Sequence, residues 1–162
     1  MAQLPAHQPE WIATAPLVVQ RERRVFAPPA AVWERIADHE TWPEWFTALK
    51  RVQVTGAAEG VGGQRVVSVP GATFGEVFTT WEPEARFAFA VISGPRLLAG
   101  MAESIVIEPE NTGCKVTYTQ GIEPARGFGW FWRLSRRRLS QQLATALDGL
   151  ATRAEAEHAA AD

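Results

Sequence analysis

The spacing of apolar residues divides the chain into a strand-rich central part and a helical C-terminal part. Between residues 51 and 122, short runs rich in β-branched and aromatic residues alternate with turn-forming residues about every ten positions. This pattern predicts an antiparallel meander, with strands near 51–55, 64–69, 73–82, 85–93, 101–109 and 114–122. A further strand is expected at 17–26, which gives a sheet of about seven strands.

Two short helices are expected between the first strand and the meander. The prolines Pro28 and Pro29 end the first strand, and residues 30–37 follow with their apolar side chains on one side. A second short helix is expected from Trp42 to about Leu49, because bulky apolar side chains recur there at helical spacing. Two short helices are therefore expected to separate the first strand from the meander.

A long C-terminal helix is expected from Phe128 to Glu157. Its apolar positions follow the three-and-four spacing of one buried face: 128, 131, 132, 139, 143, 146, 147 and 150. The first part of this face is aromatic and the remainder is aliphatic, with Ser135 between them. We expect the aromatic part to border a ligand and the aliphatic part to anchor the helix on the sheet.

Four arginines of this helix lie mostly away from the apolar face: Arg133, Arg136, Arg137 and Arg138. The simpler interpretation is a solvated helix face, as charged helix surfaces usually are. The alternative is attraction to an anionic membrane surface or to an acidic partner. Both interpretations remain open at this point.

Composition narrows the class of protein. A chain of 162 residues that is 46% hydrophobic and 21% charged fits one domain with a substantial core. A net charge of -2 and a pI near 6.0 argue against a nucleic-acid binder. Neither a membrane span nor a secretory signal is evident, so no integral membrane segment and a cytoplasmic location are expected. Cys114 is the only cysteine and has no metal-ligand spacing, so we expect no disulfide, metal or cofactor.

Four segments carry a family resemblance. They are residues 27–33 (APPAAVW), 36–38 (IAD), 42–45 (WPEW) and 81–87 (WEPEARF). In these segments the chain resembles the START-like or SRPBCC superfamily, in its polyketide cyclase/dehydrase-like branch, over about residues 17–155. The resemblance implies an α+β helix-grip fold, in which a curved antiparallel sheet wraps around the long C-terminal helix. The chain is expected to comprise a flexible leader at 1–15, which is rich in proline, alanine and glutamine, one START-like ligand-binding domain at 16–157 and a disordered tail at 158–162. Alternatively, Trp11 and Ile12 of the leader dock onto the domain.

The phase of side chains along the strands selects candidate polar groups for a cavity. Glu103 shares its phase with Met101 and Ile105, which places a carboxylate among apolar neighbours. Burial would raise its pKa and suit it to donate a proton or a hydrogen bond. Alternatively, Glu103 lies at the end of the cavity, beside solvent or an arginine such as Arg65 or Arg96.

Other side chains are candidates on the same grounds. Tyr118 is either a hydroxyl inside the cavity or a core tyrosine, and the facing of Glu76 stays ambiguous. A serine at position 135 either leaves room for a ligand or bonds its own helix backbone. The expected ligand-binding set is Trp42, Trp45, Phe46, Glu76, Phe78, Phe87, Phe89, Met101, Glu103, Tyr118, Phe128, Phe131, Trp132 and Ser135. Within this set, Glu103 and Tyr118 are the candidates for catalysis.

The favoured function is binding or carriage of a hydrophobic small molecule, such as a lipid, an isoprenoid or a polyketide-like compound, without catalysis. Members of the superfamily bind such molecules, and some catalyse cyclisation or dehydration, but no shared catalytic motif exists to carry over. A cyclase or dehydratase that uses Glu103 or Tyr118 as acid or base is the first alternative. A protein-interaction or regulatory module is the second. The chain is expected to be a monomer or a homodimer, with peripheral membrane contact left open.

Overall fold

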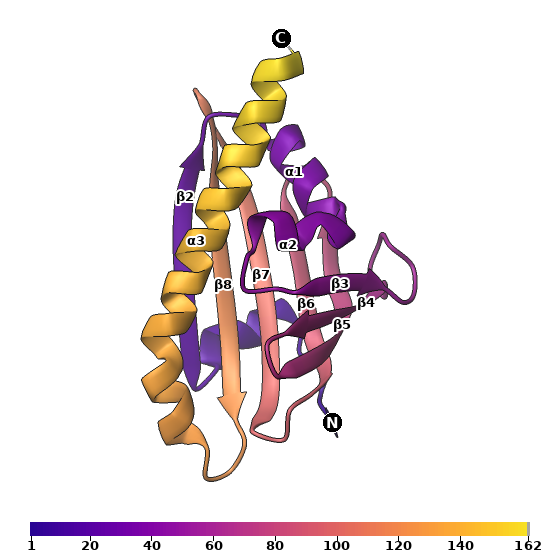
Figure 1. Cartoon of the computed structure of the whole chain (residues 1–162), viewed down its shortest axis with the longest axis vertical. Helices are drawn as coiled ribbons and strands as arrows, with labels where there is room; N and C mark the ends of the chain where they lie inside the picture. The colour runs from indigo at the N-terminus through magenta and orange to yellow at the C-terminus, as the bar shows by residue number, and fades with distance from the viewer. Residues whose placement is uncertain (162) are drawn as a thin grey trace.

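A curved antiparallel sheet packs against one long helix, as Figure 1 shows. The structure is a computed structural model and describes residues 1–161. The strands are β1 (Ala2–Gln3), β2 (Leu17–Val25), β3 (Arg51–Val54), β4 (Gln64–Val69), β5 (Ala72–Glu82), β6 (Arg86–Gly94), β7 (Leu98–Glu110) and β8 (Gly113–Pro124). The helices are η1 (Pro9–Thr14), α1 (Pro29–Ala37), η2 (His39–Thr41), α2 (Trp42–Trp45) and α3 (Gly129–Ala161).

The strand order is β2-β8-β7-β6-β5-β4-β3, with β1 added beside β6. Strands β3 to β8 form the meander that the sequence predicts, and β2 pairs with the last strand, from Leu17 opposite Ile122 to Val25 opposite Cys114. The two short helices follow β2, and α3 comes last. The predicted α+β helix-grip fold is therefore confirmed.

The turn between β4 and β5 shows how local sequence sets the path of the sheet. Val69 lies opposite Ala72, so only Pro70 and Gly71 connect the two strands. Gly71 has a φ of 79°, a left-handed conformation that side chains with a Cβ rarely adopt. Proline followed by glycine therefore fixes a tight turn, and this turn lies at one end of the cavity described below.

The aliphatic half of α3 anchors the helix on the sheet, as its sequence predicts. Leu143, Leu147 and Leu150 are fully buried in the main hydrophobic core. Helix α2 approaches this part of α3 closely, because a Cβ at Gly149 would collide with the backbone carbonyl of Trp45. The core thus fills the end of the molecule where α1, α2 and the C-terminal half of α3 meet the sheet (Figure 1).

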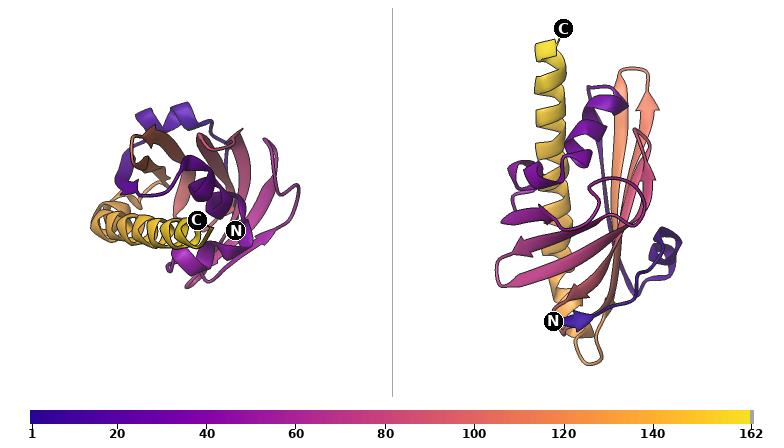
Figure 2. Two further views of the ribbon diagram at one scale, coloured as in Figure 1. Left: turned by 90° about the horizontal axis from the view of Figure 1, so that it is seen from above. Right: turned by 90° about the vertical axis from the view of Figure 1, so that its right-hand side faces the viewer.

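The segment at 1–15 follows the alternative expected for the leader, in which it docks onto the domain. Strand β1 pairs with β6, and η1 packs on β7 and β8 with Ile12 buried. Figure 2 shows η1 on the opposite side of the sheet from α3. The close approach is possible because Gly121 has no side chain: a Cβ there would lie 3.1 Å from the Ile12 Cα atom. A single glycine in β8 therefore gives the segment a place to dock.

Two helix ends differ from the expected ones. Helix α2 ends at Trp45 instead of about Leu49, because Phe46 leaves the helical region with φ -109° and ψ 82°. Helix α3 runs through Ala161, so the tail expected to be disordered at 158–162 is helical as far as it is described, and Asp162 lies outside the described residues. Within residues 1–161, no helix is long and apolar enough to cross a membrane.

Candidate functional site

A cavity of about 740 Å³ lies between the concave face of the sheet and the first half of α3. Its walls come from β4 to β8, from residues 46–50 after α2, and from residues 131–142 of α3. Most of the lining is apolar, and it includes Trp42, Phe46, Val67, Phe74, Phe89, Val91, Leu97, Met101, Trp132 and Leu139. The cavity occupies the end of the sheet that the main core leaves unfilled.

The structure brings most of the expected ligand-binding residues to this cavity. Those that line it are Trp42, Phe46, Glu76, Phe89, Met101, Glu103, Tyr118, Phe131, Trp132 and Ser135. The Pro70-Gly71 turn and the loop at 95–97 also border it. Of the aromatic first part of α3, Phe131 and Trp132 lie beside the cavity. Ser135 also lines it, and its hydroxyl donates a hydrogen bond to the Phe131 carbonyl oxygen of its own helix at 2.9 Å.

Four expected residues do not line the cavity. Trp45, Phe78 and Phe87 are buried in the main core, and Phe128 precedes α3 and is largely exposed. Phe87 shares the inward phase of Phe89, but its ring packs edge-on against those of Trp42 and Trp81 instead of facing open space. Phase along a strand thus identifies the inner face, but not which part of that face the core fills.

The expected ligand-binding set leaves out Arg65, which sequence analysis names only as a possible neighbour of Glu103. Its Nε donates a hydrogen bond to Glu76 Oε2 at 2.6 Å, and both side chains are buried. The two residues lie directly opposite each other on β4 and β5. The two-residue Pro70-Gly71 turn sets this register, so that turn is the sequence signal that could have identified the pair. The ambiguous facing of Glu76 is resolved by this pair, because Glu76 points inward.

Arg65 also ties the helical segment to the sheet. One of its terminal nitrogens donates to His39 Nδ1 at 3.0 Å, and the guanidinium carbon lies 3.8 Å from the centre of the Trp42 ring. His39 Nε2 lies 2.9 Å from the carbonyl oxygen of Ala58 and donates to it. Burial, and then the charge of Arg65, lower the pKa of His39 to about 3. His39 is therefore neutral, with its proton on Nε2.

Glu103 has a tyrosine partner and no cation partner. The Tyr118 hydroxyl donates a hydrogen bond to Glu103 Oε2, and both side chains are buried. Burial chiefly, and then the negative charge of Glu76, raise the pKa of Glu103 to about 7. Burial and the Glu103 charge likewise raise the pKa of Tyr118, which stays protonated. At neutral pH, Glu103 thus populates both protonation states and can donate or accept a proton.

Gln120 is the second polar residue that the expected site lacks. It lies opposite Glu103 in the β7–β8 pair and lines the cavity. A hydrogen bond from its side chain lowers the pKa of the Glu103 carboxyl, against the effect of burial. Its Oε1 atom is buried and has no hydrogen-bond partner among the described residues. An unpaired buried acceptor carries a free-energy cost that a ligand with an O–H or N–H group would remove.

Together these groups form a polar row across the inner face of the sheet: Arg65, Glu76, Glu103, Tyr118 and Gln120. The Arg65–Glu76 end is internally paired, so its charges are satisfied within the protein. The other end offers a carboxyl that titrates near neutral pH and an unpaired amide oxygen. An apolar cavity with a few converging polar groups is the usual form of a small-molecule site.

Fold and cavity together define a protein of the hydrophobic-ligand-binding class. The family model described as "Polyketide cyclase / dehydrase and lipid transport" matches residues 16–155. The chain belongs to this family.

Similar proteins agree with this assignment. Uncharacterized proteins of Mycobacterium tuberculosis and Mycobacterium bovis are each 31% identical over 119 residues, which cover 70% of this chain and 71% of theirs. Among solved structures, TTHA0849 from Thermus thermophilus is similar with a TM-score of 0.72 and 24% identity, over 87% of this chain and 99% of that one. XoxI from Bacillus cereus gives a TM-score of 0.68 at 14% identity, over 83% and 93% of the two chains. At these identities the structures show a shared fold.

Removing only one partner of the Arg65–Glu76 pair should be strongly destabilising. Arg65→Met leaves the Glu76 carboxylate buried without a partner, and we expect a loss of about 3–5 kcal/mol in the free energy of unfolding. The double variant Arg65→Met/Glu76→Met removes both charges and should regain most of that loss. Urea denaturation of the three proteins measures these differences. A double variant no more stable than Arg65→Met would contradict a buried ion pair between Arg65 and Glu76.

Glu103 should make stability depend on pH with a defined sign. Its pKa is about 7 in the folded protein, against 4.5 for an ordinary glutamate, so the folded state holds the proton more tightly. The resulting stabilisation is fully present below pH 4.5 and is lost as the pH rises to about 7. The shift corresponds to about 3 kcal/mol.

The measurement is urea denaturation across this pH range for the wild type and Glu103→Gln. The glutamine keeps a hydrogen-bond acceptor for Tyr118 but does not titrate, so the fall in stability should be absent from the variant. Parallel pH profiles for the two proteins would show that Glu103 has an ordinary pKa.

Proposed function

We propose that the protein binds and carries an apolar small molecule with one polar end, such as a lipid, an isoprenoid or a polyketide-like compound. The observation that carries this proposal is the distribution of polar atoms in the cavity. The walls are mainly apolar, and among the described lining residues one buried acceptor, Gln120 Oε1, has no partner and lies beside Glu103. A cavity of about 740 Å³ also lies within the range of small-molecule sites.

The same atoms suggest the chemistry of the polar end. Gln120 Oε1 accepts a hydrogen bond, so it would select a hydroxyl or an N–H group on the ligand. Protonated Glu103 can donate, so it would select a carbonyl or hydroxyl oxygen. A hydroxyl or hydroxyketone end satisfies both groups. The apolar remainder of the ligand would lie against Met101, Trp132 and Leu139, which line the cavity.

Filling the cavity from α3 should abolish ligand binding without disturbing the sheet. Ser135 lines the cavity and is partly exposed, so a tryptophan at this position can enter the space. We expect Ser135→Trp to weaken binding of the fluorescent apolar probe N-phenyl-1-naphthylamine by about tenfold or more. Gln141→Trp is the matched control, because residue 141 is exposed on the same helix and does not line the cavity. Equal probe affinity in the two variants would contradict a binding site here.

Acid–base catalysis of a cyclisation or dehydration is the second candidate function. Glu103 favours it, because a carboxyl with a pKa of about 7 can take a proton from carbon beside a carbonyl and return it to an oxygen. Tyr118 supplies a hydroxyl that already donates to this carboxyl and can orient it. The apolar walls would hold a flexible substrate in a folded conformation.

Catalysis predicts that both polar partners are needed for turnover. Glu103→Gln and Tyr118→Phe should each lower turnover of a poly-β-ketone substrate by about 10²–10⁴-fold, the usual contribution of a general acid or base. Glu108→Gln serves as the control, since residue 108 is on the same strand but exposed. Chromatography of the products measures turnover, and far-ultraviolet circular dichroism checks the fold. Unchanged turnover in both cavity variants would exclude this mechanism.

A further inference from the structure

The start of α3 exposes large apolar side chains that the core does not use. Phe128, Trp130 and Leu134 are 42%, 63% and 77% exposed, although the adjacent Trp132 is buried. Trp130 and Leu134 are four residues apart in the helix and therefore lie on one face. Exposed apolar residues are ordinary when scattered singly, but a group of them at one site indicates a contact surface.

Arginines surround these apolar residues. The surface, which we call the aromatic–arginine patch, consists of Phe128, Trp130, Leu134, Arg133, Arg136 and Arg137. The three arginines are exposed, and within residues 1–161 none of them forms an ion pair. The sequence from residue 124 to residue 147 contains no aspartate or glutamate, although the whole chain has a net charge of -2. The patch is therefore a local concentration of positive charge on an otherwise slightly acidic protein.

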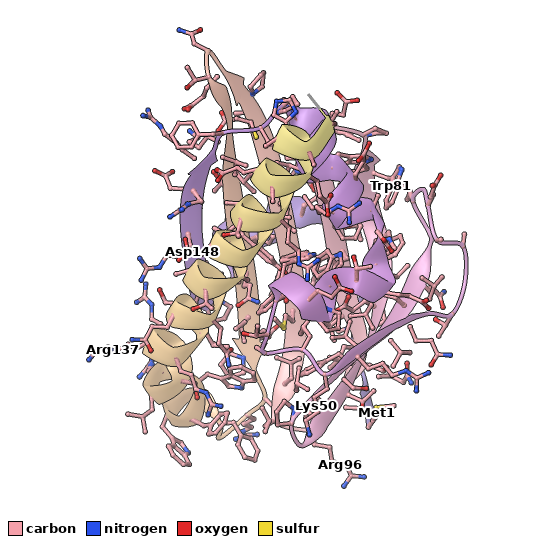
Figure 3. The ribbon with its side chains drawn as sticks, turned by 45° about the horizontal axis from the view of Figure 1, so that its top comes forward. Met1, Lys50, Trp81, Arg96, Arg137 and Asp148 are labelled. Carbon is pink, nitrogen blue, oxygen red and sulfur yellow. The ribbon has the colours of Figure 1, made fainter. Side chains whose placement is uncertain are left out.

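The patch lies beside the cavity. Phe131 and Arg138, which fall within the same helical turns, line the cavity, and the rings of Trp130 and Phe131 are 6.2 Å apart. Figure 3 shows Lys50 and Arg96 toward the end of the molecule at which α3 begins, with Arg137 pointing away from the body. Lys50 also lines the cavity. Positive charge and exposed apolar side chains thus occur together beside the cavity at this end of the molecule.

We infer that the aromatic–arginine patch docks the protein on an anionic lipid membrane, with the cavity turned toward the bilayer. Tryptophan and leucine enter the region between headgroups and acyl chains, while arginines pair with lipid phosphates. Docking as such requires no bound ligand, so it is independent of the proposed carriage. It would give an apolar ligand a short path between membrane and cavity.

The composition of the patch favours a membrane over a second copy of the chain. A two-fold interface between copies would place the patch against itself, with arginines facing arginines. The patch has no acidic residue to pair with them, so this arrangement is repulsive. A lipid surface supplies phosphates at many positions and needs no matching shape, which suits a convex helix face.

Co-sedimentation with vesicles tests docking directly. We expect the purified full chain to bind vesicles of equimolar phosphatidylcholine and phosphatidylglycerol, and to bind vesicles of phosphatidylcholine alone at least about tenfold more weakly. Added sodium chloride should release the protein, because salt screens the arginine–phosphate attraction. Binding that is equal on both vesicles, or absent from both, would overturn the inference.

Two variants locate the surface. Arg136→Glu/Arg137→Glu should lower the partition coefficient by at least about thirtyfold, and Trp130→Ser/Leu134→Ser by about tenfold or more. Arg23→Glu/Arg24→Glu is the matched control: it changes the net charge equally on β2, whose arginines already form the exposed ion pairs with Asp148 and Glu110. Equal losses in the control and the patch variant would overturn the inference, since net charge alone would then explain binding.

Analytical ultracentrifugation separates docking from association. A monomer in solution whose sedimentation is unchanged by Trp130→Ser/Leu134→Ser supports a membrane surface. If the wild type is a dimer and this variant is a monomer, the inference of membrane docking is overturned in favour of a protein interface. Retention of a small molecule by the vesicle-negative variants would leave the proposed carriage standing, so failure of the two proposals can be told apart.

Discussion

The buried ion pair between Arg65 and Glu76 determines much of what the cavity can do. It joins β4 to β5 and, through His39 and Trp42, connects the helical segment to the sheet. Because Arg65 bonds to Glu76, it does not bond to Glu103. The second carboxylate is left to a tyrosine and a glutamine, and the charge of Glu76 adds to the effect of burial. Burial chiefly, and then the charge of Glu76, thus raise the pKa of Glu103 to about 7, against the opposing effects of its hydrogen bonds and of the Arg65 charge.

This division of charge suits a cavity for an apolar molecule. One end of the polar row is satisfied within the protein and holds the wall in place, whereas the other end retains an unpaired acceptor and a carboxyl of variable protonation. Helix α3 has a similar division of roles. Its C-terminal half is buried against the sheet, and its first turns border the cavity on one face and expose aromatic and basic residues on another. Ligand binding in the cavity and contact at the exposed face of α3 can therefore be altered separately, by substitutions at different residues.

The elements of this fold could be predicted because they depend on local pattern. Period-two runs, proline and glycine turns and an apolar stripe gave the order of the strands and helices. The phase of β7 likewise predicts that Glu103 faces inward, whereas the phase of β8 leaves two positions open for Tyr118, in the cavity or in the core. The pairing of Arg65 with Glu76 follows from the two-residue Pro70-Gly71 turn, which sets the register of β4 and β5. The contacts of Arg65 with His39 and Trp42 could not be predicted, because they come from a distant helical segment. The different surroundings of Phe87 and Phe89 could not be predicted either. The two residues share a phase, but the side chains that pack in front of each ring come from distant segments. The docking of η1 likewise depends on the remote Gly121.

The most direct test of a ligand-binding cavity is a crystal structure of the protein purified from its own cells. We expect electron density for an elongated apolar molecule between the sheet and α3, with a polar end within hydrogen-bonding distance of Gln120 Oε1 or the Glu103 carboxyl. A cavity that holds only ordered water, or that closes through movement of α3 onto the sheet, would contradict the claim that this fold is built here to hold an apolar ligand.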